Sequence, residues 1–388
     1  MPINPAIADL VPDAQAWRRD LHANPELLYD LPRTAQFVAE RLRAFGCDEV
    51  RTAIGRAGVV GVIRGRKGDS QRAIGLRADM DALPIEEATN LPYRSRAPGK
   101  MHACGHDGHT AMLLGAARYL AATRNFSGSA VVIFQPAEEG GGGGKAMIDD
   151  GLMEAFPIEE VYAIHNAPKV PVGAFATRKG PLMAAADFFT LRLEGKGGHA
   201  GFPHLCADSI VAGAQIVTAL QTIVARNVDP LDCCVVSVAR FTSGANDNVL
   251  PQTAELEGTV RSLLPATRDL AERRFREIVA GIAAASGIAA SLHYVRSYPP
   301  TINHPAQTDF AASVARRLVG PERVTTEAPP TMGAEDFSFM LEARPGAFIW
   351  IGNGDSAGLH HPAYDFNDAA LPYGMAYFVG IIETGLAP

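Results

Sequence analysis

The segment HTAMLLGAARYLAATRNFSGSAVVIFQ (residues 109–135) decides the fold class. Apolar side chains recur at helical spacing over residues 109–123, and residues 129–135 form a nearly continuous apolar run. The upstream segment AIGLRAD (residues 73–79) is a second short apolar run. A buried strand, a helix and another buried strand in this order are typical of a parallel sheet that helices cover on both faces.

The same alternation extends over most of the chain. Residues 13–45 carry the pattern of two helices, and residues 309–320 form a further amphipathic helix. Short apolar runs predict additional strands at residues 59–65, 159–166 and 347–353. We therefore expect an α/β protein with a mainly parallel sheet.

Residues 184–296 follow a different rhythm. Their patterns predict the order strand, helix, strand, strand, helix, strand, which is the ferredoxin-like unit. A segment of about 110 residues is long enough to have a core of its own. The strand–helix alternation resumes after residue 300. We therefore expect a discontinuous domain of residues 1–183 and 297–388, with a ferredoxin-like α+β domain of residues 184–296 inserted into it and a cleft between the two.

Composition bears on the partners of the chain. It has 388 residues, of which 47% are hydrophobic and 20% charged, and its formal net charge is −7. The acidic balance and the lack of Lys/Arg blocks predict no nucleic-acid partner. No uninterrupted apolar run reaches about 18 residues, so we expect no membrane span. The N-terminal segment lacks the basic start and apolar run of a signal peptide, and the expected location is cytoplasmic.

Side chains that bind metals or transfer protons gather where the predicted strands end. Asp79 and Asp81 lie at the end of one strand, and Glu138 and Glu139 follow another. The other candidates are His165 at the end of a strand, Cys104 and His106 before the helix, and His360 and His361 after the last strand. Ligands of an open parallel sheet bind outside the carboxyl ends of its strands, so we expect these residues at one edge.

This set of side chains is suited to a dinuclear metal site. Two divalent cations about 3.5–4 Å apart need roughly four or five protein ligands. Such a set is Cys104, His106, Glu139, His165 and His361. A thiolate can bridge two metals, and one member of an adjacent carboxylate pair can bind metal while the other acts as a general base. Sulfur and imidazole ligands suit Zn²⁺, Mn²⁺, Co²⁺ or Ni²⁺.

Six motifs occur in an order and spacing that resemble the M20 metallopeptidase family. They are RADMDALPI (77–85), MHACGHDGH (101–109), FQPAEEG (134–140), GKGGHAGFPH (195–204), NVLPQTAELEGTVR (248–261) and MGAEDF (332–337). The chain is most similar to the branch of hippurate hydrolases, N-acyl-amino-acid amidohydrolases and plant auxin-conjugate hydrolases. The resemblance covers nearly the whole chain.

The resemblance implies a role for each candidate in a centre of two divalent metal ions. It implies Cys104 as the bridge, Glu139 and His361 at one metal position, His106 and His165 at the other, and Glu138 as the general base. His360 competes with His361, and only the motif match favours His361. One departure is plain: Arg77 stands where other branches carry a metal-binding histidine. We therefore expect Asp79, which would orient that histidine, not to be a ligand.

The resemblance also implies that residues 184–296 form a lid and dimerisation domain, and that the protein is a homodimer or a dimer-based homo-oligomer. His199 matches a lid histidine that polarises the scissile carbonyl and often comes from the partner subunit. Asn248 and Arg261 match positions that hold the substrate carboxylate, which the arginine fork can bind through two hydrogen bonds.

The expected activity is metal-dependent hydrolysis of N-acyl or N-aroyl amino acids, small molecules such as hippurate, to a carboxylic acid and a free amino acid. The alternative is a metallo-dipeptidase or carboxypeptidase that acts on unblocked peptides. That activity would call for an acidic pocket for a free α-amino group, and the sequence shows no such pocket. His204 and Glu335 receive no role from the sequence.

Overall fold

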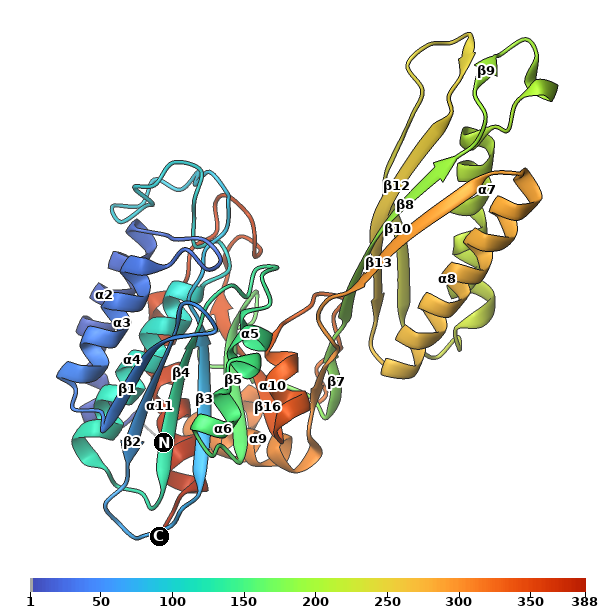
Figure 1. The fold of residues 1–388 in the computed structure, drawn as a ribbon. Helices are drawn as coiled ribbons and strands as arrows, with labels where there is room; N and C mark the ends of the chain where they lie inside the picture. Colours follow the sequence, from blue (N-terminus) through green and yellow to red (C-terminus); the bar gives the residue numbers. More distant parts are fainter. Residues whose placement is uncertain (1–2) are drawn as a thin grey trace. The chain divides into compact units, whose positions relative to one another are not determined.

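The computed structural model describes residues 3–388, and the chain forms two compact units (Figure 1). The larger unit contains the residues up to 180 together with 302–329 and 336–388. The smaller unit contains residues 181–301 and 330–335. The chain thus passes between units at 180–181 and 301–302, where the sequence analysis set the boundaries at 183–184 and 296–297.

The larger unit is built on an eight-stranded sheet with the order β1-β2-β4-β3-β5-β16-β6-β15. The strands are β1 (Glu49–Ile54), β2 (Gly58–Arg64), β3 (Ala73–Asp79), β4 (Ser129–Gln135), β5 (Glu160–Pro168), β6 (Phe175–Ala176), β15 (Val324–Thr325) and β16 (Gly346–Gly354). The central strands β4, β3, β5 and β16 run parallel, as do β6 and β15. Antiparallel pairing joins β1 to β2, β2 to β4 and β6 to β16. The prediction of a mainly parallel sheet is confirmed.

Helices cover this sheet and complete its core. They are α1 (Pro5–Ala8), α2 (Val11–Ala23), α3 (Pro32–Ala44), α4 (His106–Thr123), α5 (Gly143–Asp149), α6 (Leu152–Ala155), α9 (Pro305–Val319), α10 (Phe337–Ala343) and α11 (Leu371–Gly385). Helix α4 packs against the central strands and against α2 and α11, and α5 packs on β4 and α10. Leu113, Phe134 and Ile164 are fully or almost fully buried between these layers. This burial explains the apolar runs, since each buried side chain of this size contributes about 1.5–3 kcal/mol.

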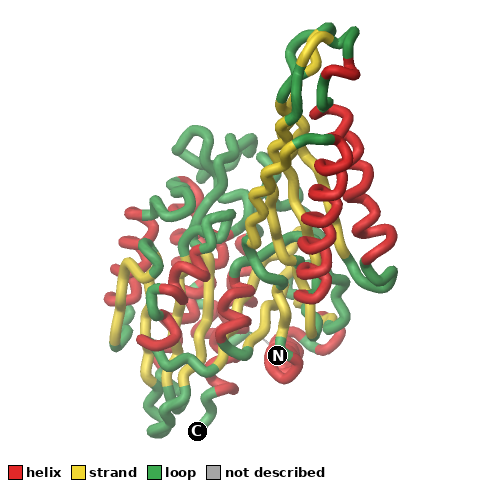
Figure 2. The backbone as a smooth tube through the Cα atoms, turned by 45° about the vertical axis from the view of Figure 1, so that its right-hand side comes forward, coloured by secondary structure: helices red, strands yellow, loops and turns green. Residues whose placement is uncertain are grey.

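The smaller unit is a four-stranded antiparallel sheet with two helices (Figure 2). Its elements in chain order are β8 (Ala185–Glu194), α7 (Ser209–Thr222), β10 (Cys234–Ser243), β12 (Thr253–Ser262), α8 (Pro265–Ser286) and β13 (Ala289–Arg296). The strand order is β10-β12-β8-β13. This is the ferredoxin-like arrangement, and the prediction of an inserted unit of this type is confirmed. Two short strands, β9 (Gly198–His199) and β11 (Val249–Leu250), pair with each other.

Helix α7 continues into a π-helical turn at Ile223–Asn227. Among the described residues, the stretch Ser209–Asn227 is one helix that is long and apolar enough to cross a membrane. Its side chains Ala212, Ile216 and Leu220 are buried in the core of the smaller unit, which accounts for its apolar composition. A single such helix is weak evidence for a span. The cytoplasmic location stays a prediction.

Candidate metal centre

The candidate ligands lie at the edge of the larger unit's sheet where the parallel strands end. Strand β3 ends at Asp79, β4 at Gln135 and β5 shortly after His165. The loop before α4 returns to the same edge through Gly105, whose φ of 89° is in the left-handed region. A Cβ at this glycine would lie 2.3 Å from the side-chain nitrogen of Asn166. Glycine is therefore required between Cys104 and His106.

Two groups of potential metal ligands share one side chain. Cys104, His106 and His165 form one group, and Cys104, Glu139 and His360 form the other. Within each group the ligand atoms lie within 4.8 Å of one another. The Cys104 Sγ atom lies 3.4 Å from His165 Nε2. A thiolate that belongs to both groups is placed as a bridging ligand between two metal ions would be.

The two buried imidazoles are held in the tautomer that binds metal through Nε2. His106 Nδ1 lies 2.8 Å from the carbonyl oxygen of Asp81, and His165 Nδ1 lies 2.8 Å from the carbonyl oxygen of Asn166. A carbonyl oxygen only accepts, so each Nδ1 carries the proton and each Nε2 presents a lone pair. Such hydrogen bonds to the second nitrogen are typical of metal-binding histidines.

Unpartnered polar atoms support a metal at this place. His106 Nε2 and Glu139 Oε1 are buried and have no hydrogen-bond partner. Buried polar atoms are nearly always satisfied, so these two need a further partner. Sulfur, imidazole and carboxylate together are a donor set for divalent transition metals. The residues present therefore fit a pair of metal ions.

Asp81 holds the pair Glu138–Glu139 in place. Its carboxylate oxygens accept hydrogen bonds from the backbone N–H groups of Glu138 and Glu139, at 2.9 and 3.1 Å. Glu138 is 7% exposed, and its carboxylate lies with the ligand atoms of His106 and Glu139 in a further group. One carboxylate of the pair thus belongs to the group around Cys104, and the other lies beside it.

Of the two adjacent histidines after β16, the geometry favours His360 rather than the expected His361. His360 Nε2 lies 3.3 Å from Glu139 Oε1. Its φ of 61° is in the left-handed region, which is uncommon outside glycine and which costs energy. His361 directs Nδ1 to the backbone N–H of Ala363, at 3.0 Å, and belongs to none of the ligand groups found in residues 3–388.

His109 is committed to other partners. Its Nδ1 lies 2.6 Å from Asp79 Oδ1, and its Nε2 accepts the backbone N–H of Asn166 at 2.9 Å. It has no lone pair left for a metal. Asn166 also donates to the carbonyl oxygen of Cys104 at 2.6 Å and accepts from Tyr364 at 2.7 Å. The sequence analysis missed Asn166 and Tyr364, and the available signal was the position of Asn166 directly after His165.

Comparison with known proteins identifies the family. The sequence profile of peptidase family M20/M25/M40 matches residues 75–384. The chain belongs to peptidase family M20. It is 43% identical to hippurate hydrolase of Campylobacter jejuni, over 97% of this chain and 98% of that protein. It is 42% identical to thermostable carboxypeptidase 2 of Saccharolobus solfataricus, over 86% of this chain and 84% of that protein.

A solved structure agrees with this assignment. A Bacillus subtilis protein, described as a dinuclear metal binding peptidase from the M20 family, superimposes with a TM-score of 0.85. It is 33% identical to this chain and covers 98% of it, with 99% of its own length matched. This M20 protein is therefore a metal-dependent amidohydrolase, and its ligand groups correspond to a dinuclear centre.

Without metal, the electrostatics of this M20 centre keep the thiol protonated. Burial raises the pKa of Cys104 well above its usual range, and the charges of Glu139 and Glu138 raise it further. Burial alone would also raise the pKa of Glu139, but the imidazole of His360, whose Nε2 lies 3.3 Å from Glu139 Oε1, and the charge of His106 outweigh burial and lower that pKa. A thiolate at Cys104 therefore requires cations at the centre.

A separate buried network lies behind the ligand loop. Asp107, in the first turn of α4, lies 2.8 Å from His22 Nδ1, and Arg18 Nε lies 3.7 Å from the same carboxylate. Burial lowers the pKa of His22, but its bonds to Asp107 and Glu87 outweigh burial and raise the pKa to about 9. This charged network contacts the first turn of α4 through Asp107.

In the smaller unit, the expected catalytic residue His199 lies together with Asn248, one of the two expected substrate-binding residues. His199 pairs with Val249 across the β9–β11 ribbon, and the N–H of Ala200 donates to the carbonyl oxygen of Asn248 at 3.0 Å. His199 Nδ1 accepts the N–H of Gly201 at 3.0 Å, so its Nε2 carries a proton and can donate. The exposed ring of Phe202 lies beside His199, with centroids 5.2 Å apart.

Arg261 lies on the four-stranded sheet, near the end of β12 that is farther from the β9–β11 ribbon. It is on β12, where its Nε donates to Thr259 at 3.0 Å and its guanidinium lies 5.6 Å from the ring of Phe188. Strand β12 begins at Thr253, close to β11, and rises about 3.3 Å per residue, so Arg261 is about 26 Å from that end. Within one chain, Asn248 and Arg261 therefore cannot hold the same small carboxylate.

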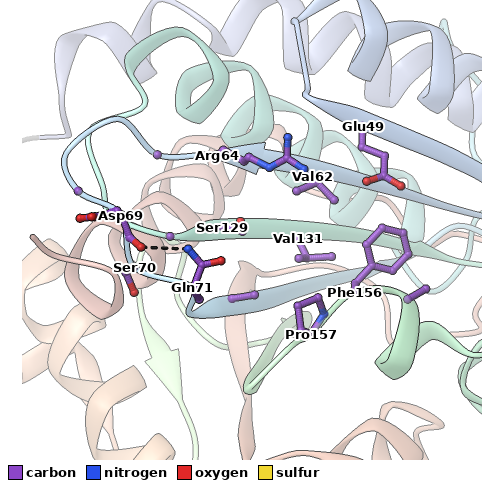
Figure 3. Close-up of a pocket in the computed structure, with 15 residues that line it drawn as sticks. Glu49, Val62, Arg64, Asp69, Ser70, Gln71, Ser129, Val131, Phe156 and Pro157 are labelled. Atoms are coloured by element: carbon purple, nitrogen blue, oxygen red, sulfur yellow. Dashed lines mark hydrogen bonds between the residues drawn. The ribbon is translucent and has the colours of Figure 1, made fainter.

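A pocket at the opposite end of the large sheet is unrelated to the ligand groups (Figure 3). Its walls include Arg64 at the end of β2, Ser129 at the start of β4, and Phe156. Gln71 donates to the carbonyl oxygen of Asp69 at 3.0 Å across its rim. The lining contains none of the candidate metal ligands.

Proposed function

We propose that this M20 amidohydrolase cleaves the amide bond of N-acyl and N-aroyl amino acids, and that it releases a carboxylic acid and a free amino acid. The observation that carries the proposal is the sharing of Cys104 by two ligand groups, with Glu138 beside them. Similarity to a hippurate hydrolase over almost the full length of both chains supports this substrate class.

The proposed ligands follow from the two groups. Cys104 would hold both ions, His106 and His165 would hold one of them, and Glu139 and His360 would hold the other. When bound, two ions such as Zn²⁺, Mn²⁺, Co²⁺ or Ni²⁺ supply Lewis acidity and lower the pKa of a water molecule to about 7.

Glu138 is the proposed general base and acid. It accepts the proton of the attacking water and then delivers a proton to the leaving nitrogen. Asp81 fixes the backbone of Glu138, so the carboxylate stays directed to the centre. General acid–base catalysis of this kind contributes about 10²- to 10⁴-fold to the rate.

His199 is a proposed catalytic residue, and Asn248 and Arg261 are the proposed substrate-binding residues, with contributions from two subunits. The Nε2–H of His199 donates to the scissile carbonyl, and the carboxylate of the amino acid is bound by Arg261 and Asn248. Since Arg261 lies about 26 Å along β12 from Thr253, the end of the strand that follows β11, we propose that His199 and Asn248 serve the active site of a partner subunit in a homodimer.

A carboxypeptidase or dipeptidase activity is the second candidate, because the chain is also 42% identical to a thermostable carboxypeptidase. The test is release of amino acids from hippurate, N-acetyl and N-indoleacyl amino acids and unblocked dipeptides. Each substrate is offered to chelator-treated protein, and then to protein supplied with Zn²⁺, Mn²⁺, Co²⁺ or Ni²⁺. Metal-restored cleavage of the blocked substrates supports the proposal, whereas cleavage of unblocked dipeptides alone overturns it.

A further inference from the structure

Arg77 is a fully buried arginine in β3, two residues before Asp79. Its Nη1 donates to Asp79 Oδ2 at 2.7 Å and its Nε donates to Gln135 Oε1 at 2.9 Å. Its Nη2 donates to Asp336 Oδ1 at 3.1 Å. Three partners at three nitrogens hold the planar guanidinium in one orientation, which a lysine could not reproduce.

Asp79 lies between this arginine and the metal centre. The same Oδ2 atom that Arg77 binds is 3.7 Å from His106 Nε2, the unpartnered nitrogen of a proposed metal ligand. The other oxygen, Oδ1, is 2.6 Å from His109 Nδ1. Asp79, His106 and His109 also have the mutual spacing of a metal-binding group. Asp79 is thus close enough to bind a metal, and each of its oxygens already accepts one hydrogen bond, from Arg77 or from His109.

We propose that Arg77 withholds the Asp79 carboxylate from the metal at the His106–His165 position. The inference rests on the proposed metal centre. Cys104, His106 and His165 are three protein ligands, and catalytic sites keep a further position open for water or substrate. A carboxylate as fourth ligand would close that position, as it is closed in structural sites. The buried arginine therefore preserves an open coordination position.

The other hydrogen bonds around Asp336 hold Arg77 in place and involve none of the proposed metal ligands. Asp336 accepts from Gln135 Nε2 at 2.7 Å and from the backbone N–H of Gly144 at 2.8 Å. Asp79 and Asp336 are both fully buried, and one guanidinium lies between them. The arrangement holds the cation on Asp79 Oδ2, the carboxylate oxygen that lies near His106 Nε2.

The test compares the wild type and Arg77→Met, each loaded with Co²⁺, whose visible absorption weakens as the coordination number rises. With Asp79 released to the metal, Arg77→Met should absorb more weakly and bind Co²⁺ more tightly than the wild type, while turnover falls by about 10- to 100-fold. A merely structural role for Arg77 gives the opposite sign, because a loosened site binds Co²⁺ more weakly.

Two further variants keep the test decisive. Adding Asp79→Asn to Arg77→Met should restore the wild-type spectrum, since an amide is a poor metal ligand. If Arg77→Met fails to fold because two buried carboxylates lose their counter-ion, Arg77→Met with Asp336→Asn is compared instead. The matched control is Arg268→Met in the smaller unit, where Arg268 donates to buried Asp187 at 2.9 Å. Its cobalt spectrum should be unchanged.

The outcomes separate this inference from the metal centre itself. If the wild type binds fewer than two Co²⁺ ions per chain, or shows no thiolate absorption band from Cys104, the proposed centre is overturned. If the wild type binds both ions and Arg77→Met has the same spectrum, or binds Co²⁺ more weakly, only the role of Arg77 is overturned. Weaker absorption with tighter binding, reversed by Asp79→Asn, supports it.

Discussion

The Nε2 atom of His165 lies 3.4 Å from the Sγ atom of Cys104, and both residues are buried. Because burial and nearby carboxylates raise the pKa of this thiol, it becomes a metal ligand only when cations compensate the thiolate charge. Replacing Cys104 with serine should therefore remove the thiolate-to-cobalt absorption band and lower the metal content below two ions per chain. The control is Cys234→Ser, which changes a buried cysteine in the smaller unit and should leave metal content unchanged. Full metal content in Cys104→Ser would contradict the bridging role.

Glu138→Ala should separate catalysis from metal binding. We expect a loss of about 10²- to 10⁴-fold in kcat with metal content near that of the wild type, because this carboxylate transfers protons and is not assigned as a ligand. Glu139→Ala is the matched variant, since its buried carboxylate oxygen lacks a hydrogen-bond partner and is the proposed ligand. That variant should lose metal. Metal analysis after dialysis distinguishes the two, and equal metal loss in both would show that the roles are misassigned.

His360→Ala and His361→Ala test which of the adjacent histidines binds metal. The 3.3 Å separation between His360 Nε2 and Glu139 Oε1 predicts that only the first variant loses an ion. We expect a decrease of about 10- to 100-fold in affinity at one position, by analogy with the effect of removing partners around a metal. Stepwise titration with a chelator measures it. Metal loss confined to His361→Ala would instead support the assignment that the motif suggested.

This pair of histidines also shows why part of the site could not be predicted from the sequence. Both residues follow β16, and the choice between them depends on the φ of 61° at His360 and on the hydrogen bond from Ala363 to His361. Neither is visible as a pattern of residue types. By contrast, Cys104, His106 and His165 were predictable, because a strand end and a helix start fixed their place in the fold.

Parts of the fold were also predictable from the sequence, and other parts were not. Residues 73–79 and 129–135 coincide with β3 and β4, since buried strands of a parallel sheet are apolar on both faces. Strands β6 and β15 have two residues each, which is too short for any periodicity. Helix α4 begins at His106 rather than at 109, because its first turn buries polar ligand side chains in place of apolar ones. Sequence pattern thus locates the core but not the polar first turn.

Subunit mixing tests whether His199 acts on the site of a partner. One chain carries Glu138→Ala and the other His199→Ala, so each homodimer should be inactive. If His199 acts across the dimer, one site of each mixed dimer has both groups, and a statistical 1:1 mixture should recover about a quarter of wild-type activity. No recovery, in a mixture shown by mass spectrometry to contain mixed dimers, would mean that His199 acts within its own chain.

The pair His22–Asp107 should make the stability of the larger unit depend on pH. The folded pKa of His22, about 9, is above its ordinary value of 6.5, so its protonation favours the folded state. This contribution is fully present below pH 6.5 and is lost as the pH rises through about 9. The shift corresponds to at most about 3 kcal/mol. His22→Gln should therefore be destabilised most near pH 6, and the difference from the wild type should shrink toward pH 9.5, where almost all of it is lost.

Urea unfolding of metal-free protein measures this difference. The chain has two tryptophans, Trp17 and Trp350, and both lie in the larger unit, so tryptophan fluorescence reports the unfolding of that unit. His293→Gln in the smaller unit serves as the control, because His293 lies on an exposed position of β13 and should leave the fluorescence transition unchanged at every pH. A destabilisation of His22→Gln that stays constant from pH 6 to 9.5 would show that His22 contributes through packing and not through its charge. A difference that instead grows with pH would mean that His22 is neutral in the folded protein.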